Sequence, residues 1–285
     1  MAFLLFVLGM AAGSFINVLS LRYVLYNSSE EGIGVRLWSR RIFGGRSHCF
    51  NCGQILKWWE MVPLLSFIFL RGRCRKCENP LSLQYPLIEL LAGLIFVFVP
   101  WRITSHLTVI WLIIFLLFLL LSIIDFRLSV IPDEVNIALG ILGIVLMLFL
   151  FFTMSLDIFN YSFLKHYALL FDVGENIFVS RLAGAAAGMA SLGLIIILSG
   201  GRAMGWGDFK LGLALGLIFG WPDILLTLAL SFLLGGIVGG ILLVRGQKSL
   251  KDAVPFGPFL ALGATLVFFF GYEIINGYFR LFNLY

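Results

Sequence analysis

Long apolar runs separated by short polar segments make up most of the chain. A hydrocarbon core about 30 Å thick requires about 20 helical residues to span it, and most of the runs approach this length. The predicted spans are residues 3–21, 81–100, 104–124, 135–152, 177–199, 209–220, 224–244 and 256–275. The run 209–220 is too short to cross alone, and we expect it to tilt or to borrow flanking residues. The pattern predicts an all-α polytopic membrane protein with about eight transmembrane helices.

Composition agrees with this pattern, because 61% of the 285 residues are apolar and only 12% are charged. These proportions exclude an ordinary water-soluble globular protein. The first run has no Lys or Arg ahead of it and is followed by Arg22. Because this charge order is the reverse of that in a cleavable secretory signal, we expect a retained transmembrane helix.

The net charge of +5 comes from basic residues in the segments between the spans. With the N-terminus outside, the cytosolic segments are 22–80, 125–134, 200–210 and 245–255, and they hold 16 of the 20 Lys and Arg residues. The other four are Arg102, Lys165, Arg181 and Arg280. The positive-inside rule therefore predicts that both termini lie outside. Since the charge is a topology signal, it does not indicate nucleic-acid binding.

Small residues recur at four-residue spacing in two of the predicted helices, 177–199 and 224–244. The pairs are Gly184 and Gly188, Gly235 and Gly239, and Gly236 and Gly240. This spacing is typical of helices whose backbones pack closely in a membrane.

All four cysteines lie in the long polar segment 22–80, as Cys49-x-x-Cys52 and Cys74-x-x-Cys77. Two such pairs separated by 21 residues are typical of a structural Cys₄ zinc site. A disulfide is disfavoured in a reducing compartment, and free or redox-active thiols are the remaining alternative. His48 adjoins the first pair, and with four cysteines present we expect it to be a bystander. A closed Cys₄ site has no open coordination position, so it would fold the segment and catalyse nothing.

Carboxylates near the membrane are the second chemical signal, because their cost near hydrocarbon makes them functional candidates. Asp125 ends the third span and Asp208 begins the sixth, both at the predicted cytosolic face. Two neighbouring carboxylates share one proton, which is the chemistry of aspartic proteases, and Gly205 and Gly207 would leave room for a substrate backbone. The alternative remains that each Asp caps a helix or pairs with Arg127 or Lys210.

Two further acids are ambiguous from the sequence. Asp133 follows Pro132 and is expected to cap the fourth span. Glu89 lies inside the second span, where it would either contact a cationic group or pair with an Arg of the basic segment.

Several motifs together resemble the prepilin peptidases, the Gly-x-Gly-Asp class of intramembrane aspartic proteases. Asp125 with Ile131-Pro132-Asp133, and Gly205-Trp206-Gly207-Asp208-Phe209-Lys210-Leu211, are similar to the two catalytic motifs of that family. Elsewhere the resemblance rests on Gly13-Ser14-Phe15-Ile16-Asn17-Val18, Ser47-His48-Cys49, Pro63-Leu64-Leu65-Ser66, Leu70-Arg71-Gly72-Arg73-Cys74-Arg75-Lys76-Cys77 and Tyr85-Pro86-Leu87-Ile88-Glu89-Leu90-Leu91.

The resemblance implies a specific activity. Such enzymes cut the basic leader from type IV prepilins and pseudopilins after a Gly on the cytosolic face of the bacterial inner membrane. Many then methylate the new N-terminal amine with S-adenosylmethionine. Carried over, Asp125 and Asp208 are the catalytic pair, with Gly205, Gly207, Asp133 and Lys210 in support. Cys49, Cys52, Cys74 and Cys77 are the zinc ligands, and Glu89 is a methyltransferase or substrate contact.

The predicted organisation is therefore a first transmembrane helix in residues 1–21, a cytosolic zinc-binding module in 22–80 and a seven-helix protease domain in 81–285. Prepilins and the lipid bilayer are the expected partners, with Glu30, Glu31 and Glu60 as candidate leader contacts. The sequence gives no indication of oligomeric state, of the pilin served, or of the Asp that holds the proton.

Two alternatives belong to other classes. A proton-coupled transporter would use Asp125, Asp208 and Glu89 as a proton relay. A zinc metalloprotease is weaker, because the chain lacks His-Glu-x-x-His and its histidines, His48, His106 and His166, are scattered.

Overall fold

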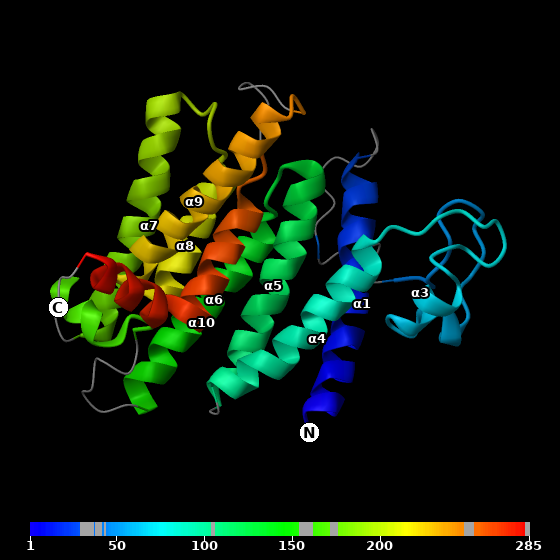
Figure 1. Ribbon diagram of the computed structural model, residues 1–285, viewed down its shortest axis with the longest axis horizontal. Coiled ribbons are helices and arrows are strands. Elements are labelled where there is room, and N and C mark those ends of the chain that lie inside the picture. Colours follow the sequence, from blue (N-terminus) through cyan, green and yellow to red (C-terminus); the bar gives the residue numbers. More distant parts are fainter. Residues whose placement is uncertain are drawn as a thin grey trace. The chain divides into compact units, whose positions relative to one another are not determined.

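The computed structural model of the protein describes residues 1–28, 37, 42, 44–103, 106–153, 162–171, 176–247 and 254–282. Its long helices are α1 (Ala2–Ser28), α4 (Gln84–Arg102), α5 (Leu107–Leu128), α6 (Asp133–Thr153), α7 (Ile177–Ser199), α8 (Trp206–Phe219), α9 (Asp223–Val244) and α10 (Gly257–Leu281) (Figure 1). The short ones are α3 (Leu65–Phe69) and the 3₁₀ helices η1 (Trp58–Met61) and η3 (Lys165–Phe171). The described residues form no strand, only two isolated β-bridges. The all-α prediction is confirmed.

Seven of these helices are long and apolar enough to cross a membrane, and α8 is the exception. It has 14 residues, a length of about 21 Å at 1.5 Å per residue. It begins at Trp206, three residues before the apolar run, and ends before Gly220, whose φ of 77° is strained for any other residue. We expected the run 209–220 to be lengthened by flanking residues, and α8 is lengthened only at its N-terminal end, by residues 206–208.

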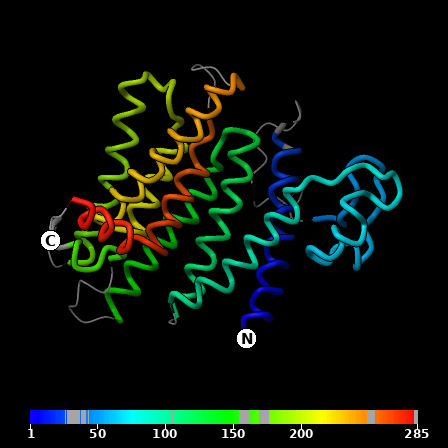
Figure 2. Tube along the Cα trace, in the orientation of Figure 1, coloured from blue at the N-terminus to red at the C-terminus, as the bar shows by residue number. Residues whose placement is uncertain are grey.

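The chain divides into two compact units, Met1–Ile124 and Asp125–Tyr285. In the first unit α1 packs along α4, and the cysteine-containing module is inserted between these two helices in the sequence (Figure 2). The helices approach closely because Gly13 carries no side chain, and a Cβ there would lie 2.8 Å from Ala92 Cβ and 2.9 Å from Glu89 Cα. Asn17, also buried, donates from Nδ2 to the carbonyl of Tyr85 at 3.1 Å.

In the second unit α8 is largely buried and packs against α6 and α7. A Cβ on Gly212 would lie 2.8 Å from the carbonyl oxygen of Gly188, and a Cβ on Gly184 would lie 2.7 Å from the carbonyl oxygen of Gly216. Because residue numbers rise along α8 as they fall along α7, the two helices are antiparallel. Close backbone packing at Gly184 and Gly188 is confirmed.

The same prediction is wrong for most of the glycines of α9. A Cβ added at Gly236, Gly239 or Gly240 would meet no atom within 4 Å, and only Gly235 approaches a neighbour, Phe256, at 3.3 Å. The spacing alone does not distinguish a helix face that packs from one that is exposed, and Gly236 and Gly240 are exposed.

A buried polar cluster joins the start of α9 to the residues that precede η3. Asp223 accepts hydrogen bonds from Ser162 Oγ at 2.6 Å and from the backbone N–H of Phe163 at 2.8 Å. Arg181 of α7, equally buried, donates to the carbonyls of Leu217 and Ile218 at the end of α8. Because these charges are satisfied by hydrogen bonds, they can be buried, and they tie α7, α8 and α9 together at the end where α8 stops.

Candidate functional site

Asp125 lies in the last turn of α5 and is 4% exposed. Its Oδ2 accepts a hydrogen bond of 2.9 Å from the backbone N–H of Gly257, the first residue of α10. The N-terminus of a helix carries a partial positive charge and unsatisfied N–H groups, so this placement stabilises a carboxylate.

Asp208 is the third residue of α8 and caps its own helix. Its Oδ2 accepts a hydrogen bond of 3.1 Å from the backbone N–H of Gly205, the N-cap residue. The other oxygen, Oδ1, is buried and has no hydrogen-bond partner among the described residues. The alternative that Asp208 caps a helix is therefore correct, but capping involves only Oδ2 of its two carboxylate oxygens.

The turn between α5 and α6 brings Asp125 and Asp208 to the same end of the second unit. Gly207 rests on this turn, because a Cβ there would lie 3.1 Å from Ile131 Cβ. The carboxylate of Asp208 is close enough to that of Asp125 to repel it electrostatically. The small size of Gly207 thus has a packing reason, whereas a Cβ on Gly205 would meet only ordinary contacts, the nearest 3.7 Å away.

Lys210 pairs with Asp133, and its Nζ lies 2.8 Å and 2.9 Å from the two carboxylate oxygens. The alternative pairing of Lys210 with Asp125 or Asp208 is therefore not what the structure shows. Asp133 is the first residue of α6, where the carbonyl of Pro132 accepts the first N–H groups of the helix, from Val135 and Asn136. The N-cap residue of α6 is thus Pro132 and not Asp133 as expected, and Asp133 is part of the first turn of the helix.

Asn136 of α6 is a member of this cluster that sequence reasoning missed. It is 5% exposed, and its Nδ2 donates to the carbonyl oxygen of Gly207 at 3.1 Å. Its Oδ1 is buried without a hydrogen-bond partner in the described part of the chain. The available signal was an amide placed one turn after Asp133 in an otherwise apolar run. Asn136 Oδ1 is thus a second buried oxygen at the site that has no hydrogen-bond partner among the described residues, in addition to Oδ1 of Asp208.

The four cysteines form a second cluster, in the first unit. Their Sγ atoms all lie within 4.8 Å of one another, with Cys49 to Cys77 at 3.8 Å and Cys52 to Cys74 at 3.9 Å. Four sulfurs at the 2.3 Å Zn–S bond length form a tetrahedron with edges of about 3.8 Å. The donor set and its spacing therefore fit a metal ion such as Zn²⁺. His48 contacts the carbonyl of Arg46 and is not a member of the cluster.

The two cysteine pairs have the same backbone hydrogen bonds. Cys49 N–H donates to Gln54 and Gly53 N–H to Cys49, while Cys74 N–H donates to Asn79 and Glu78 N–H to Cys74, with lengths of 2.9 to 3.0 Å. Gly53 and Glu78 are equivalent positions, with φ of 68° and 54°. Each pair is thus a tight turn that directs two sulfurs to one point.

Hydrogen bonds to sulfur favour the thiolate form that binds metals. The amide of Asn51 donates to Cys77 Sγ at 3.5 Å, and this bond, followed by one from the backbone N–H of Asn79, lowers the pKa of Cys77 to about 6. The backbone N–H groups of Cys77 and Lys76 lower the pKa of Cys74. Cys74 and Cys77 are therefore prepared to bind a cation, whereas Cys52 is not. A backbone hydrogen bond at Gln54 lowers the pKa of Cys52, but burial and the neighbouring cysteines raise it to about 11.

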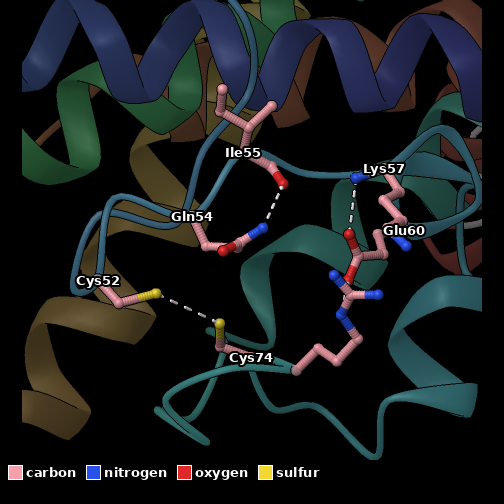
Figure 3. A network of polar contacts seen from close by, with 7 residues as sticks. Cys52, Gln54, Ile55, Lys57, Glu60 and Cys74 are labelled. Atoms are coloured by element: carbon pink, nitrogen blue, oxygen red, sulfur yellow. Dashed lines mark hydrogen bonds and ion pairs between the residues drawn. The ribbon is translucent and has the colours of Figure 1, made fainter.

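Glu60 stabilises the cysteine module from inside. It is 8% exposed, accepts a hydrogen bond of 2.6 Å from Lys57 N–H, and lies 3.2 Å from Nε of Arg75. Figure 3 shows its carboxylate directed to the backbone nitrogen of Lys57, and it shows the sulfurs of Cys52 and Cys74 facing each other. These contacts disfavour a leader contact for Glu60, and Glu30 and Glu31 lie outside the described residues.

Glu89 joins this module to α4. It is 7% exposed, and its Oε2 accepts a hydrogen bond of 2.8 Å from the backbone N–H of Leu64, a residue with φ of 58°. At the other end of the module, Arg22 of α1 donates to the carbonyls of Ile42 and Gly45 at 2.9 Å and 3.1 Å. The carboxylate and the guanidinium thus anchor the module to the two helices that flank it in sequence.

Comparisons with known proteins match both units. Residues 7–103 match the model of the bacterial Peptidase A24 N-terminal domain, and residues 111–240 match the type IV leader peptidase family. A prepilin leader peptidase/N-methyltransferase from Xanthomonas campestris pv. campestris is 32% identical over 97% of this chain and 94% of its own length. Proteins of the same name from Pseudomonas putida and Aeromonas hydrophila are 31% and 30% identical, over 94% and 96% of this chain and 90% and 92% of their own lengths. No solved structure matches the chain.

Proposed function

Because the chain belongs to the type IV leader peptidase family, we propose that it removes the leader from type IV prepilins or pseudopilins and methylates the new N-terminal amine. S-adenosylmethionine is the methyl donor, as the N-methyltransferase name of its relatives implies. The comparisons give no support to the alternative of a proton-coupled transporter.

The support for the protease assignment is that Asp125 and Asp208 lie at the same end of the second unit, where Gly207 packs on the turn that follows α5. One carboxylate is ionised and takes a proton from a water molecule, whose oxygen attacks the carbonyl carbon of the leader's last residue. The other is protonated, donates a hydrogen bond to the developing oxyanion, and then passes a proton to the leaving amine. We assign these roles to the pair, because two coupled carboxylates titrate as a unit.

The surrounding residues serve this chemistry by position. Gly257 N–H and Gly205 N–H each occupy one oxygen of a catalytic carboxylate, and the second oxygen of each carboxylate is the one that we assign to the proton transfers. Asn136 fixes the carbonyl of Gly207, and the Lys210–Asp133 pair holds α8 against α6. Since Lys210 is paired with Asp133, it does not hold Asp208 in its ionised form.

The cysteine cluster is proposed as a structural Zn²⁺ site formed by Cys49, Cys52, Cys74 and Cys77. With four thiolates the ion has no free coordination position, so it folds the module and takes part in no reaction step. Residues 1–21, 22–80 and 81–285 are then the first transmembrane helix, the zinc module and the protease domain. Glu89 supports methylation or substrate binding, and its hydrogen bond to Leu64 ties it to the module.

We place the active site at the cytosolic face of the bacterial inner membrane, with both termini outside. The supporting argument is that segments 22–80, 125–134, 200–210 and 245–255 hold most of the basic residues. Although α8 is short, it runs antiparallel to α7, with Phe209 near Gly193 and Gly220 near Arg181. It therefore runs beside α7 from about Gly193 to Arg181, and on this support we retain the eight-helix topology.

The test is cleavage of a prepilin-like peptide by the protein reconstituted in liposomes with S-adenosylmethionine, followed by mass spectrometry. Asp125→Asn and Asp208→Asn keep the side-chain size but remove the charge, and we expect each to abolish leader release. Glu134→Gln, at the same helix end as Asp133, is the matched control and should cleave normally. Cleavage by either Asn variant at the normal rate would refute the catalytic pair. A product without an added methyl group would refute the second activity alone.

A further inference from the structure

The short helix α3 has its apolar side chains on the outside. Leu65, Ile68 and Phe69 occupy positions i, i+3 and i+4, which lie on one face of a helix, and they are 51%, 67% and 77% exposed. Phe67 is turned inward, since a Cβ on Gly72 would lie 2.9 Å from its ring. An exposed apolar face of this kind marks a surface that another molecule or a membrane covers.

The hydrogen bond between Leu64 of the module and Glu89 of α4 fixes how deep the exposed face of α3 lies in the membrane. Leu64, the residue before α3, is hydrogen-bonded to Glu89, and Glu89 is the sixth residue of α4, about 7.5 Å along the helix from its start. Because α4 has 19 residues, about the number that crosses a bilayer, its first turns lie where headgroups meet acyl chains. Interfacial helices bury their apolar faces about 5–10 Å into this boundary.

The charges next to this face favour an anionic surface. Arg71 and Arg73 follow α3 directly and are exposed. In the described stretch 44–80 the other exposed basic residues are Arg46, Lys57 and Lys76, with Arg75 paired to Glu60, and the exposed acidic residue is Glu78. Basic residues beside an interfacial apolar face attract anionic lipid headgroups.

We propose that α3 is an interfacial helix, in which Leu65, Ile68 and Phe69 insert among acyl chains beside α4 while Arg71 and Arg73 bind the phosphates of anionic lipids. The lipid surface thus forms a third support for the cysteine module, besides the contacts of Glu89 and Arg22. A positively charged leader is a poor occupant of this surface because the neighbouring side chains have the same sign.

The experiment introduces the photoreactive residue benzoylphenylalanine at Phe69 of the full chain, in vesicles of phosphatidylethanolamine and phosphatidylglycerol. The matched control has the same residue at Glu78, an exposed position in the second cysteine turn of the same module. After illumination, mass spectrometry identifies what is joined to each position. We expect lipid adducts at position 69 to exceed those at position 78 by at least about tenfold, as an inserted apolar face requires.

The charge component is tested by Arg71→Gln and Arg73→Gln in the position 69 protein. The preference of the adducts for phosphatidylglycerol should fall roughly fivefold for each Arg removed. Adducts at position 69 to an added prepilin peptide, to a second copy of the chain or to the chain itself, in place of lipid, would overturn the proposal. Equal lipid adducts at both positions would overturn it as well. None of these readouts depends on cleavage, so the result is separate from that of the protease test.

Discussion

The close approach of α7 and α8 makes Gly212→Ala a sharp perturbation of the proposed protease site. Gly212 lies four residues after Asp208, one turn along α8. A Cβ at this position would lie 2.8 Å from the carbonyl oxygen of Gly188 and 2.8 Å from Leu192 Cδ1, whereas ordinary contact begins at 3.4 Å. The methyl group therefore forces α8 away from α7 by about 0.6 Å, the difference between these two distances.

The magnitude of the effect follows from this displacement. Overpacking costs about 1–3 kcal/mol, and replacing Gly by Ala inside a helix returns about 1 kcal/mol. We expect a net loss of stability of about 0–2 kcal/mol, so the variant folds. Displacing a catalytic group by about 1 Å can lower a rate 10²-fold, and a shift of about half that size should lower kcat for leader cleavage about tenfold.

Thermal unfolding in detergent and cleavage kinetics in liposomes measure the two quantities. Gly240→Ala in α9 is the matched control, because a Cβ there meets no atom within 4 Å. It should raise Tm slightly, because Ala gains about 1 kcal/mol over Gly in a helix, and leave kcat near the parent value. Unchanged Tm and kcat in Gly212→Ala would refute the close packing of α7 on α8. A lower Tm with an unchanged kcat would refute the link between this packing and the position of Asp208.

Three other predictions follow from single contacts. Asn51→Ala removes the hydrogen bond to Cys77 Sγ and should weaken zinc affinity about 10- to 100-fold, measured by competition with a chelator; unchanged affinity would contradict the role of Asn51. Gly53→Ala should make the module more sensitive to proteolysis, while Glu78→Gly, at the equivalent φ, should protect it, and the opposite order would contradict the equivalence of the two turns. Asn136→Leu leaves the carbonyl of Gly207 without its donor and should cost about 1–3 kcal/mol in unfolding free energy, together with a lower cleavage rate; a fully active and stable variant would exclude Asn136 from the site.

Helix positions were predictable from the sequence wherever apolar runs meet clear stop signals. The prediction of 177–199 coincides with α7, which begins after Asn176 as its N-cap and ends at Gly200 with φ of 60°. Elsewhere the helices continue past the apolar run into polar residues. α5 extends to Leu128 and thereby includes Asp125, and α1 extends to Ser28. Hydropathy locates the part of a helix inside the membrane, whereas the helix itself ends where the backbone turns, as at Ser129 with φ of 52°.

The cysteine cluster was predictable because each Cys-x-x-Cys pair is formed by one short turn of the chain. The two turns have the same length and the same backbone hydrogen bonds. The contacts of the protease site were not, because they join distant segments. Asp125 and Gly257 are 132 positions apart, Asp133 and Lys210 are 77 apart, and Asn136 and Gly207 are 71 apart. A sequence motif identifies the carboxylates. It does not identify the backbone N–H, lysine or amide that lies beside them, because that depends on packing among α6, α8 and α10.

Helix N-termini explain how two carboxylates can be held near each other with no basic partner among the residues that the structure describes. Asp208 accepts an N–H at the start of α8, and Asp125 accepts one at the start of α10. The partial positive charge at a helix N-terminus offsets repulsion between the carboxylates by a modest amount, about 0.3–1 kcal/mol for an ordinary site. An ion pair with Lys210 would stabilise the doubly ionised pair far more and would remove the shared proton on which the proposed mechanism depends. The pairing of Lys210 with Asp133 instead keeps this ammonium group engaged away from the two carboxylates.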